Sequence, residues 1–501
     1  MKKVVSCISA LLILASFALQ AGHSGRRIVN YVNFVRYDDY RIDNSEELLY
    51  DATLQEILLA RKYDLPSTFL LQYDALIDPA YQALFKEHMQ PGWELGIWWE
   101  ITRPHALDAG LEWPLEHSWE PYSVLDFSIG HDRSSRVKLV DAYMEKFKSI
   151  WGEYPRSVGS WYLDSFTLQY MRDKYGVEAC CICKDQMGTD GYTLWGGYWN
   201  QAYYPSRGCL YMPAQTTDGQ IDVPVFRMLG SDPIYQYISG ISENGQGCVS
   251  LEPVYRLGGG DRNWVEYFME SMSSEPCLAY SYAQAGQENS FTWRKIGPGL
   301  EMQVPYLDSL RKAGKIEILT LGESGRWFRK NFRVTPPTAV TAMNDFRNEG
   351  RKAVWYDSRF YRARLFWTEE VFMIQDIHLF DESYVSPFDD AVATGRRFSI
   401  KAIPVVDGYS WSVGDDLAGL YIILQDGTKY KFENPSIVEH PRKGRLTVKS
   451  GDGLFKIICD ENTLKIKGRA KGWKAIIHNP SSGEDSVLPV RRRMCRWSAL
   501  D

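Results

Sequence analysis

The stretch "RSVGSWYLDSFTL", residues 156–168, places one aspartate, Asp164, between a strand-like run of aromatic and small residues and a helix-like run. An aspartate beside Ser165 at a helix start accepts hydrogen bonds from backbone N–H groups that lack other partners. At the carboxyl end of a barrel strand, the same carboxylate would face a catalytic mouth. The stretch therefore leaves two interpretations open, a helix cap and a catalytic group.

Around this stretch, short strand-like runs alternate with amphipathic helical runs from about residue 28 to residue 330, a pattern typical of a parallel α/β sheet or barrel. The predicted strands include 27–39, 67–76, 93–101, 176–185 and 316–325. The predicted helices include 51–65, 135–152, 263–272 and 301–315. A long Gly-, Tyr- and Pro-rich region, roughly 186–262, shows little helical periodicity and is predicted to wall a binding cleft.

The character of the chain changes after about residue 335. Short alternating strands follow, and Asp426-Gly427 and Asp452-Gly453 stand where tight hairpin turns are needed. Residues 336–501 are therefore predicted to form an all-β sandwich, which would brace the preceding domain or bind polysaccharide.

The first 22 residues read as a signal peptide, with Lys2 and Lys3 before an apolar stretch from Val4 to Leu19. No later segment offers about 18 consecutive apolar residues, so we expect no membrane span and a periplasmic or secreted protein. Eight cysteines follow the predicted peptide, three of them within residues 180–183, and none has zinc-ligand spacing. Buried packing is the expected role, and a structural disulfide is the alternative.

The composition bounds the function. A chain of 501 residues suggests two or three domains, and the net charge of −6 implies no nucleic-acid partner. From Pro441 onward, however, 14 Lys and Arg stand against 6 Asp and Glu, ending in "RRRMCRW". A solvated basic face is the common explanation for this excess, and attraction of an acidic polysaccharide is the other.

Several carboxylates follow the predicted barrel strands, whose carboxyl ends all open on one face. They are Asp38 or Asp39, Glu100, Asp164, Asp185, Glu288 and Glu323. Tryptophans 98, 99, 119, 161 and 195 occur in the same regions. Sugar rings stack on aromatic side chains, and glycoside hydrolysis needs two carboxylates, so this set predicts a sugar site.

Residues 92–100, "GWELGIWWE", and the preceding "LPSTFLLQYDAL" resemble motifs of polysaccharide-deacetylase-like barrels. In that group a Gly-His-Glu-Ile-Gly run is followed by the metal-binding histidines. Here Trp98 stands at the position of the first of them, and Thr102 follows four residues later. The resemblance therefore implies the fold but not the usual Asp-His-His metal site, and no metal or cofactor is expected.

The opening stretch is similar to the Gly-x-Trp-x-Pro-Glu motif of glycoside hydrolase family 57, which has an incomplete (β/α)7-type barrel. Gly159, Trp161 and Asp164 match the motif, with aspartate in place of glutamate, and "KYGVEA" follows as expected. The resemblance implies that Asp164 is the nucleophile. It places the acid/base in "QAGQENSFTW", which offers Glu288, with Glu100 and Glu323 as further candidates for the acid/base.

The sequence thus predicts an incomplete (β/α)7-type barrel over 26–332 followed by a β-sandwich over 336–501. The predicted function is an exported glycoside hydrolase that cleaves an oligo- or polysaccharide with a pair of carboxylates. A carbohydrate deacetylase or esterase and a non-catalytic glycan-binding protein remain as alternatives. The residues expected to bind substrate are Arg36, Asp38, Trp99, His117, Trp119, Trp161, Asp185, Asp190 and Trp195.

Overall fold

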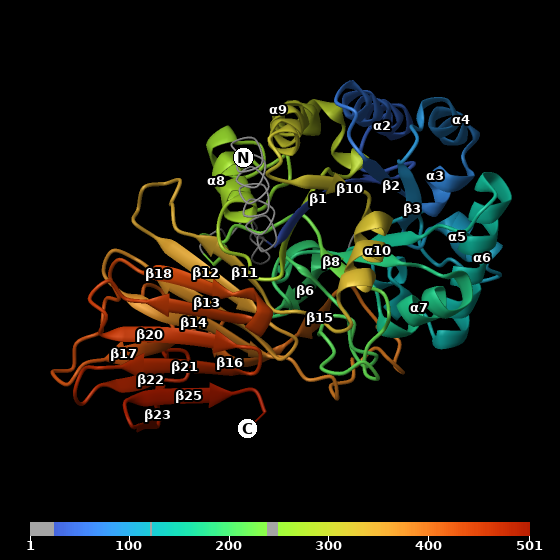
Figure 1. Cartoon of the computed structure of the whole chain (residues 1–501). Coiled ribbons are helices and arrows are strands. Elements are labelled where there is room, and N and C mark those ends of the chain that lie inside the picture. The colour runs from blue at the N-terminus through green and yellow to red at the C-terminus, as the bar shows by residue number, and fades with distance from the viewer. Residues whose placement is uncertain (1–24, 121–122, 238–248, 501) are drawn as a thin grey trace, which may run out of the picture.

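The computed structural model describes residues 25–120, 123–237 and 249–500. The predicted signal peptide at 1–22 lies outside these ranges. Figure 1 shows a parallel barrel surrounded by helices and, beside it, stacked antiparallel sheets. The predicted fold class, an incomplete α/β barrel followed by a β-sandwich, is confirmed. None of the helices in the described ranges is both long and apolar enough to cross a membrane.

Besides the short β10 (Glu317–Leu319), which runs parallel to the first strand and pairs with its first half, seven parallel strands form the barrel, and one short antiparallel strand extends its edge. In spatial order they are β9 (Tyr280–Ala285), β1 (Arg26–Val35), β2 (Ser67–Leu71), β3 (Glu94–Trp98), β4 (Ser157–Ser160), β5 (Ala179–Ile182), β8 (Val225–Arg227) and the antiparallel β7 (Ala202–Tyr203). Most of their residues are buried, as expected for a parallel sheet covered on both faces.

The barrel is left open between β7 and β9, because no strand pairing joins these two in the described chain. The side chain of Gln201 bridges the opening instead. Its carbonyl accepts from the Tyr282 N–H at 2.8 Å, and its amide donates to the Tyr282 carbonyl at 3.3 Å. One glutamine therefore supplies both hydrogen bonds that a neighbouring strand would otherwise make.

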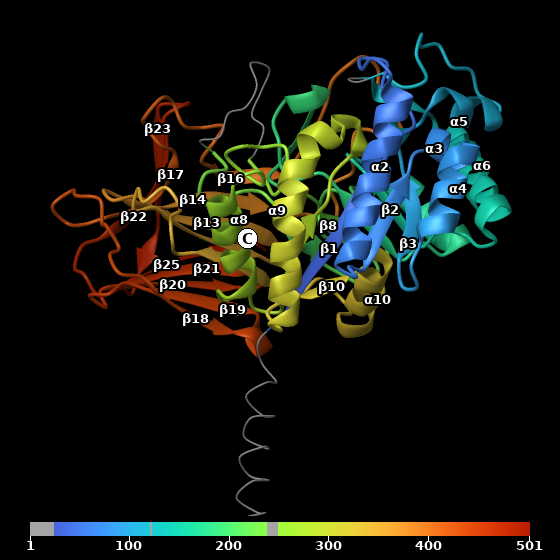
Figure 2. The ribbon, with the colours of Figure 1, turned by 90° about the horizontal axis from the view of Figure 1, so that it is seen from above.

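Helices cover the outside of the barrel, and Figure 2 shows α2 and α9 running side by side along one flank. The helix α6 illustrates how the sequence sets their bounds: Asp132 caps its start by accepting from Ser135 N–H, and Gly152, with φ 86°, ends it. The helices are α2 (Ser45–Lys62), α3 (Tyr73–Ile77), α4 (Pro79–His88), α5 (Arg103–Asp108), α6 (Arg133–Trp151), α7 (Ser165–Tyr170) with the π-helical turn η3 (Met171–Tyr175), α8 (Arg262–Ser273), α9 (Trp293–Lys312) and α10 (Leu321–Asn331).

All five predicted strands are shorter than expected, and two of them give way to a helix before their predicted end. The strand predicted over 67–76 ends at Leu71, and Tyr73–Ile77 is helical. The strand predicted over 316–325 is reduced to β10 (Glu317–Leu319), which pairs with the first half of β1. Thr320 and Glu323 form a capping box, which starts α10 directly after β10.

The C-terminal part consists of two antiparallel sheets packed face to face. The first contains β11 (Thr338–Ala342), β12 (Lys352–Asp357), β13 (Tyr361–Trp367), β14 (Phe372–Leu379), β16 (Ile403–Asp407), β17 (Gly419–Ile423), β22 (Lys474–Asn479) and β23 (Glu484–Leu488). The second contains β18 (Ser436–His440), β19 (Arg445–Lys449), β20 (Phe455–Asp460), β21 (Thr463–Gly468), β25 (Met494–Ser498) and β24 (Val490–Arg491).

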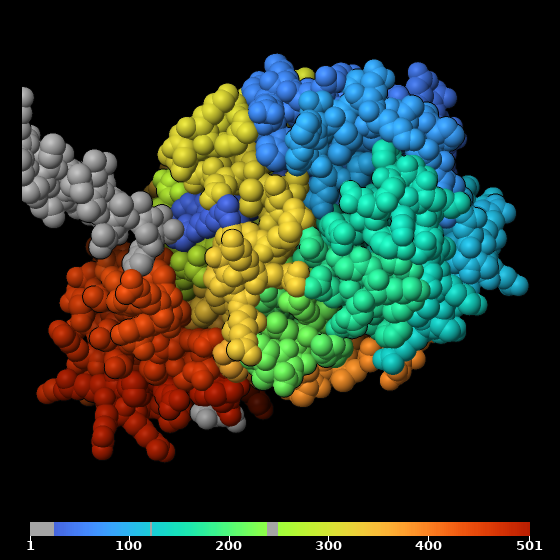
Figure 3. Space-filling view, turned by 45° about the vertical axis from the view of Figure 1, so that its right-hand side comes forward, coloured from blue at the N-terminus to red at the C-terminus, as the bar shows by residue number. Residues whose placement is uncertain are grey.

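Barrel and sandwich share an apolar interface, and the space-filling view in Figure 3 shows them in contact. The rings of Trp199 and Trp355 stack there, with centroids 4.2 Å apart. In addition, β15 (Phe398–Lys401) returns from the C-terminal half and pairs with β6 (Tyr192–Trp195) in the long loop of the barrel. The sandwich therefore holds the loop that the sequence predicted to wall a cleft.

The described cysteines are all buried and unpaired, which agrees with the packing role rather than the disulfide alternative. They are Cys180, Cys181, Cys183, Cys209, Cys277, Cys459 and Cys495. Cys7 and Cys248 lie outside the described residues.

Candidate functional site

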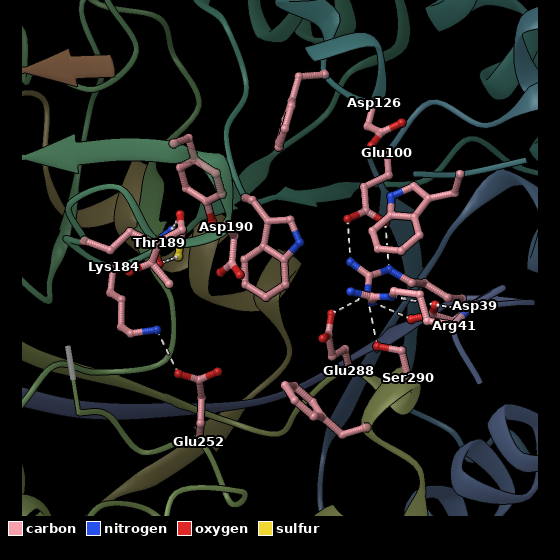
Figure 4. Close-up of a pocket in the computed structure, with 18 of the residues that line it drawn as sticks. Asp39, Arg41, Glu100, Asp126, Lys184, Thr189, Asp190, Glu252, Glu288 and Ser290 are labelled. Atoms are coloured by element: carbon pink, nitrogen blue, oxygen red, sulfur yellow. Dashed lines mark hydrogen bonds and ion pairs between the residues drawn. The ribbon is translucent and has the colours of Figure 1, made fainter. Parts of the chain in front are cut away.

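A cavity of about 550 Å³ opens at the carboxyl ends of the barrel strands. This volume lies within the usual range for small-molecule sites. Its walls come from residues that follow β1, β3, β4, β5 and β9, and from the long loop after β5 (Figure 4). The charged residues among them are Arg36, Asp39, Arg41, Glu100, Asp126, Lys184, Asp190, Glu252, Glu288 and Lys295.

One wall is built around Arg36, directly after β1, whose guanidinium serves two carboxylates. It forms a paired contact with Glu100, with Nε–Oε2 at 2.8 Å and Nη2–Oε1 at 2.6 Å. Its third nitrogen, Nη1, lies 2.8 Å from Glu288 Oε2 and donates to Ser290 Oγ at 2.9 Å. Gln72 adds a hydrogen bond to Glu100 at 3.0 Å. Glu100 is therefore held by Arg36 and Gln72, whereas Glu288 contacts a single nitrogen of Arg36 and is hydrogen-bonded by the Ser290 side chain.

Glu288 is the carboxyl group that this arrangement leaves least neutralised. Burial raises its pKa to about 7; Arg36 acts in the opposite direction, and the nearby charges of Glu100 and Asp190 add to the rise. One guanidinium cannot neutralise two buried carboxylates, so the less firmly held one takes up a proton more readily. Near neutral pH, Glu288 is thus able both to donate and to accept a proton.

The opposite wall carries a second buried ion pair. Lys184, two residues after β5, lies 2.7 Å from Glu252 Oε2, and the Gln287 amide donates to Glu252 Oε1 at 3.1 Å. Ser250 also donates to the same carboxylate. Figure 4 shows this pair across the cavity from the group around Glu100 and Glu288.

Asp190 lies between the two walls and differs from the other carboxylates of the cavity (Figure 4). Its side chain is exposed and makes no hydrogen bond or ion pair with any described residue. The surrounding protein partly desolvates it and raises its pKa, while Lys184 lowers it. Its backbone is left-handed, with φ 55°, a conformation that costs a non-glycine residue free energy. Such strain is common at functional positions.

Aromatic rings line the cavity between these charges. Trp161 after β4 and Phe291 after β9 are both half-buried and line it directly. The ring of Trp119 is covered by Arg36, whose guanidinium carbon lies 4.3 Å from the ring centroid. Trp161 and Phe291 therefore offer the open apolar surfaces, and Trp119 supports Arg36.

Asp164 does not face this cavity, which corrects its assignment as the nucleophile. Its Oδ1 accepts from Thr167 N–H at 2.9 Å and from Arg136 Nη1 at 3.1 Å, and its Oδ2 accepts from the Thr167 hydroxyl at 2.7 Å. The carboxylate is buried as the cap of α7. Its partners are the helix start and an arginine of α6, so the structure supports the capping interpretation.

Two further catalytic candidates are also placed by local contacts. Glu323 belongs to the capping box of α10 and lines a different depression, formed by the amino-terminal ends of the barrel strands. β10 pairs with residues 28–30, near the start of β1. The helix α10 that follows it therefore begins at the end of the barrel opposite the cavity. Glu100 does line the cavity, but both of its oxygens are engaged by Arg36.

Among the predicted substrate-binding residues, Arg36, Trp119, Trp161 and Asp190 line the cavity, and the others do not. Asp38 accepts from Ser45 at the start of α2, and its neighbour Asp39 lines the cavity in its place. His117 stacks on Tyr40, with centroids 3.8 Å apart. Both are held by local contacts outside the cavity.

Three of the predicted residues are buried in the protein interior. Trp99 packs edge-on against His105. Asp185 forms ion pairs with Arg227 at 2.8 Å and with Arg362 at 2.5 Å, joining barrel and sandwich. The indole of Trp195 donates to Asp407 in β16. Successive side chains after β5 point in opposite directions. Lys184 therefore reaches the cavity, whereas Asp185 points toward the sandwich.

Sequence reasoning missed Asp126, Lys184 and Glu252. Lys184 stands near the end of the strand predicted over 176–185, which is a usable signal, because strand ends supply barrel sites. Glu252 lies in the long aperiodic loop and Asp126 in a short turn, and neither carries a pattern that marks it. Burial raises the pKa of Asp126, and the charge of Glu100 adds to this.

The cavity does not offer the ligands of the usual deacetylase metal site. Trp98 is buried and stacked on Phe34, and Thr102 donates to Asp74. No histidine is among the described residues that line the cavity. The only described group with metal-like spacing is Asp376, His378 and Asp407, which lies in the sandwich.

Neither a family model nor a curated protein sequence matches the chain. Among solved structures, a candidate glycoside hydrolase/deacetylase from Parabacteroides distasonis is similar over 78% of this chain and 93% of its own, with 14% identity and a TM-score of 0.56. A polysaccharide deacetylase candidate from Mycobacterium smegmatis is similar over 61% and 92%, with 12% identity and a TM-score of 0.38. A family 57 branching enzyme from Thermococcus kodakaraensis is similar over 62% and 71%, with 11% identity and a TM-score of 0.32.

Structural neighbours thus include both groups that the sequence motifs resemble, polysaccharide deacetylases and glycoside hydrolase family 57. At these identities the likeness concerns the fold, and of the three only the first has a TM-score above 0.5. A fold of this kind hosts several activities, so the chemistry of this chain depends on the residues of its own cavity.

Proposed function

We propose that this protein is a carbohydrate-active enzyme, specifically an exported glycoside hydrolase that cleaves an oligo- or polysaccharide. The observation that carries the proposal is that two different carboxyl groups line one cavity together with aromatic rings. Glu288 has a pKa raised to about 7, and Asp190 has a carboxylate without partners among the described residues. Glycoside hydrolysis uses one protonated and one ionised carboxyl group. Export is proposed from residues 1–22.

In this proposal Glu288 is the general acid that protonates the leaving oxygen of the glycosidic bond. Its raised pKa suits the task, because a proton donor works best when its pKa lies near the working pH. Arg36 and Glu100 are positioning residues, since Arg36 contacts Glu288 while Glu100 fixes Arg36.

Asp190 is proposed as the second carboxylate, acting as nucleophile or as the base that activates water. Its lack of protein partners leaves both oxygens available, unlike Asp164, Glu100 or Glu252. Trp161 and Phe291 are proposed to stack on sugar rings, because sugars present flat apolar faces of C–H groups. These roles replace the nucleophilic role that the family resemblance implied for Asp164.

The test is a screen of plant, algal and host polysaccharides for new reducing ends, with and without a chelator. The matched variants are Glu288→Gln and Asp190→Asn, and Glu323→Gln is the control outside the cavity. We expect chelator-resistant cleavage that both cavity variants lose and the control keeps. The anomeric form of the first product then reports whether Asp190 attacks the sugar itself or takes a proton from the water that attacks it.

Two outcomes would overturn the proposal. Chelator-sensitive release of acetate would assign the cavity to deacetylation. Tight glycan binding without turnover by the unmodified protein would make it a binding protein.

A further inference from the structure

The tip of the last hairpin is made of two arginines in an unfavourable backbone conformation. Arg492 and Arg493 join β24 to β25 as a two-residue turn, with φ 50° and φ 62°. A turn with positive φ at both positions favours Asn-Gly. A left-handed conformation costs a residue with a Cβ about 1–2 kcal/mol. Two arginines thus occupy positions where their backbone conformation is unfavourable. Strained positions of this kind are common at functional sites.

The arginines belong to a group of cations without acidic partners. All are exposed, and none forms an ion pair with a described residue. The group consists of Lys471, Lys474, Arg491, Arg492 and Arg493. These cations form part of the basic excess that the sequence shows after Pro441, and they keep their charge uncompensated.

The group borders a groove of about 640 Å³ between the β21–β22 loop and the end of β23. Lys471, Lys474 and Arg493 line it together with the aliphatic run 487–490. Val487 is 63% exposed, whereas the ring of Trp473 beneath is only 4% exposed. The groove thus combines cations with an aliphatic floor and offers no open aromatic ring.

We propose that this C-terminal basic groove, lined by Lys471, Lys474, Arg493 and residues 487–490 and bordered by Arg491 and Arg492, binds an anionic polysaccharide. Guanidinium groups recognise carboxylate and sulfate groups through paired hydrogen bonds. The aliphatic floor packs against the C–H faces of sugar rings. Single-stranded nucleic acid fits less well, because its binding relies on aromatic platforms for the bases.

The choice of a glycan rests on the proposed function of the barrel cavity. In Figures 1 and 2, β23 and β25 lie in the part of the sandwich turned away from the barrel strands. The groove is thus separate from the cavity. A polymer held there stays attached between cleavage events, which raises its effective concentration at the cavity.

The test measures binding directly, by calorimetry, in a chain that also carries Glu288→Gln so that turnover is removed. The probes are oligosaccharides of polygalacturonate for carboxylate, of chondroitin sulfate for sulfate, and a neutral β-glucan. The variant is Arg492→Asn with Arg493→Gly. This pair suits the turn better, so the unfolding temperature should stay equal or rise while affinity for an anionic probe falls roughly ten-fold or more.

The control replaces two exposed cations of the barrel helices, Lys138→Gln and Lys330→Gln, and so changes the net charge equally. We expect it to keep its affinity, and we expect all anionic binding to weaken with added salt. Equal losses in both double variants would mean that only net charge matters and would overturn the proposal. Failure of the unmodified groove to bind either anionic probe, or equal binding of the neutral glucan, would also overturn it. Absence of glycan cleavage by the unmodified protein would contradict the function proposed for the cavity, and it would not change the binding that is measured at the groove.

Discussion

Asp164 and Glu288 occupy equivalent places in the chain and have opposite environments. Each follows a barrel strand and stands at the residue before a short helix, α7 or the 3₁₀ turn at Asn289–Phe291. Asp164 caps its helix and pairs with Arg136. Glu288 makes no capping bond, because its longer side chain extends into the cavity toward Arg36.

The difference lies in how many partners each carboxylate has. Both oxygens of Asp164 accept hydrogen bonds from neutral or cationic donors in the interior. Glu288 shares one guanidinium with Glu100, and burial raises its pKa to about 7. A carboxylate at a strand end is thus available for chemistry only where the helix that follows does not use it.

The largest expected effect is on catalysis at Glu288. Glu288→Gln removes the proton donor while keeping nearly the same shape, so we expect kcat to fall by about 10²–10⁴-fold. Circular dichroism and the unfolding temperature should stay close to those of the unmodified protein. Activity that persists within ten-fold would show that another group donates the proton.

Asp164 should respond in the reverse manner. Asp164→Ala leaves Arg136 buried without its partner, so we expect the free energy of unfolding to fall by about 3–5 kcal/mol. Chemical denaturation measures this loss, and kcat per folded molecule should change by less than about two-fold. Asp164→Asn keeps the cap and should recover about 1 kcal/mol. A folded Asp164→Asn protein without activity would restore Asp164 as a catalytic candidate.

The charge of Glu100 offers a finer test of the same comparison. Glu100→Gln removes a negative charge beside Glu288 and leaves Arg36 to a single carboxylate, so the pKa of Glu288 should fall by about 1 unit. Glu288 donates only when protonated, so activity is lost as the pH rises through its pKa. The alkaline limb of kcat/KM, near pH 7 in the unmodified protein, should therefore move to lower pH. An unchanged limb would separate Glu288 from the acid that the profile reports.

The smallest effect is expected at Glu323, a third carboxylate that follows a barrel strand. Glu323→Ala breaks the capping box of α10 and should lower the free energy of unfolding by about 1 kcal/mol. Activity should be unchanged, because the residue lies at the other end of the barrel. Loss of activity in a stable variant would contradict this placement.

The sequence predicted the fold class because the evidence for it is local. The alternation of strand-like and helical runs, and the Asp-Gly turns of the sandwich, follow from neighbouring residues. The length of the final barrel strand was wrong, since Thr320 and Glu323 form a capping box that ends the strand early.

The site was harder to predict, because a carboxylate is available for chemistry only if no residue from a distant part of the chain binds it. Residues 156–168 do not show that Arg136, 28 positions earlier, takes up Asp164. Likewise, the sequence around Asp185 shows a carboxylate at a strand end, but it does not show that Arg362 of the sandwich forms an ion pair with it. Arg36 and Trp161 were found because they lie at strand ends, and Glu288 because its segment also resembles the acid/base region of family 57. Glu252 was not, since the loop that carries it has no periodic pattern.

The most direct test of the account is the proton on Glu288 itself. Infrared difference titration of the unmodified protein against Glu288→Gln isolates the carboxyl band of this one residue. We predict that the band of the protonated carboxyl persists above pH 5 and disappears with a midpoint near pH 7, as burial beside a shared Arg36 requires. A midpoint near 4.5, the ordinary value for glutamate, would contradict the assignment of Glu288 as the proton donor.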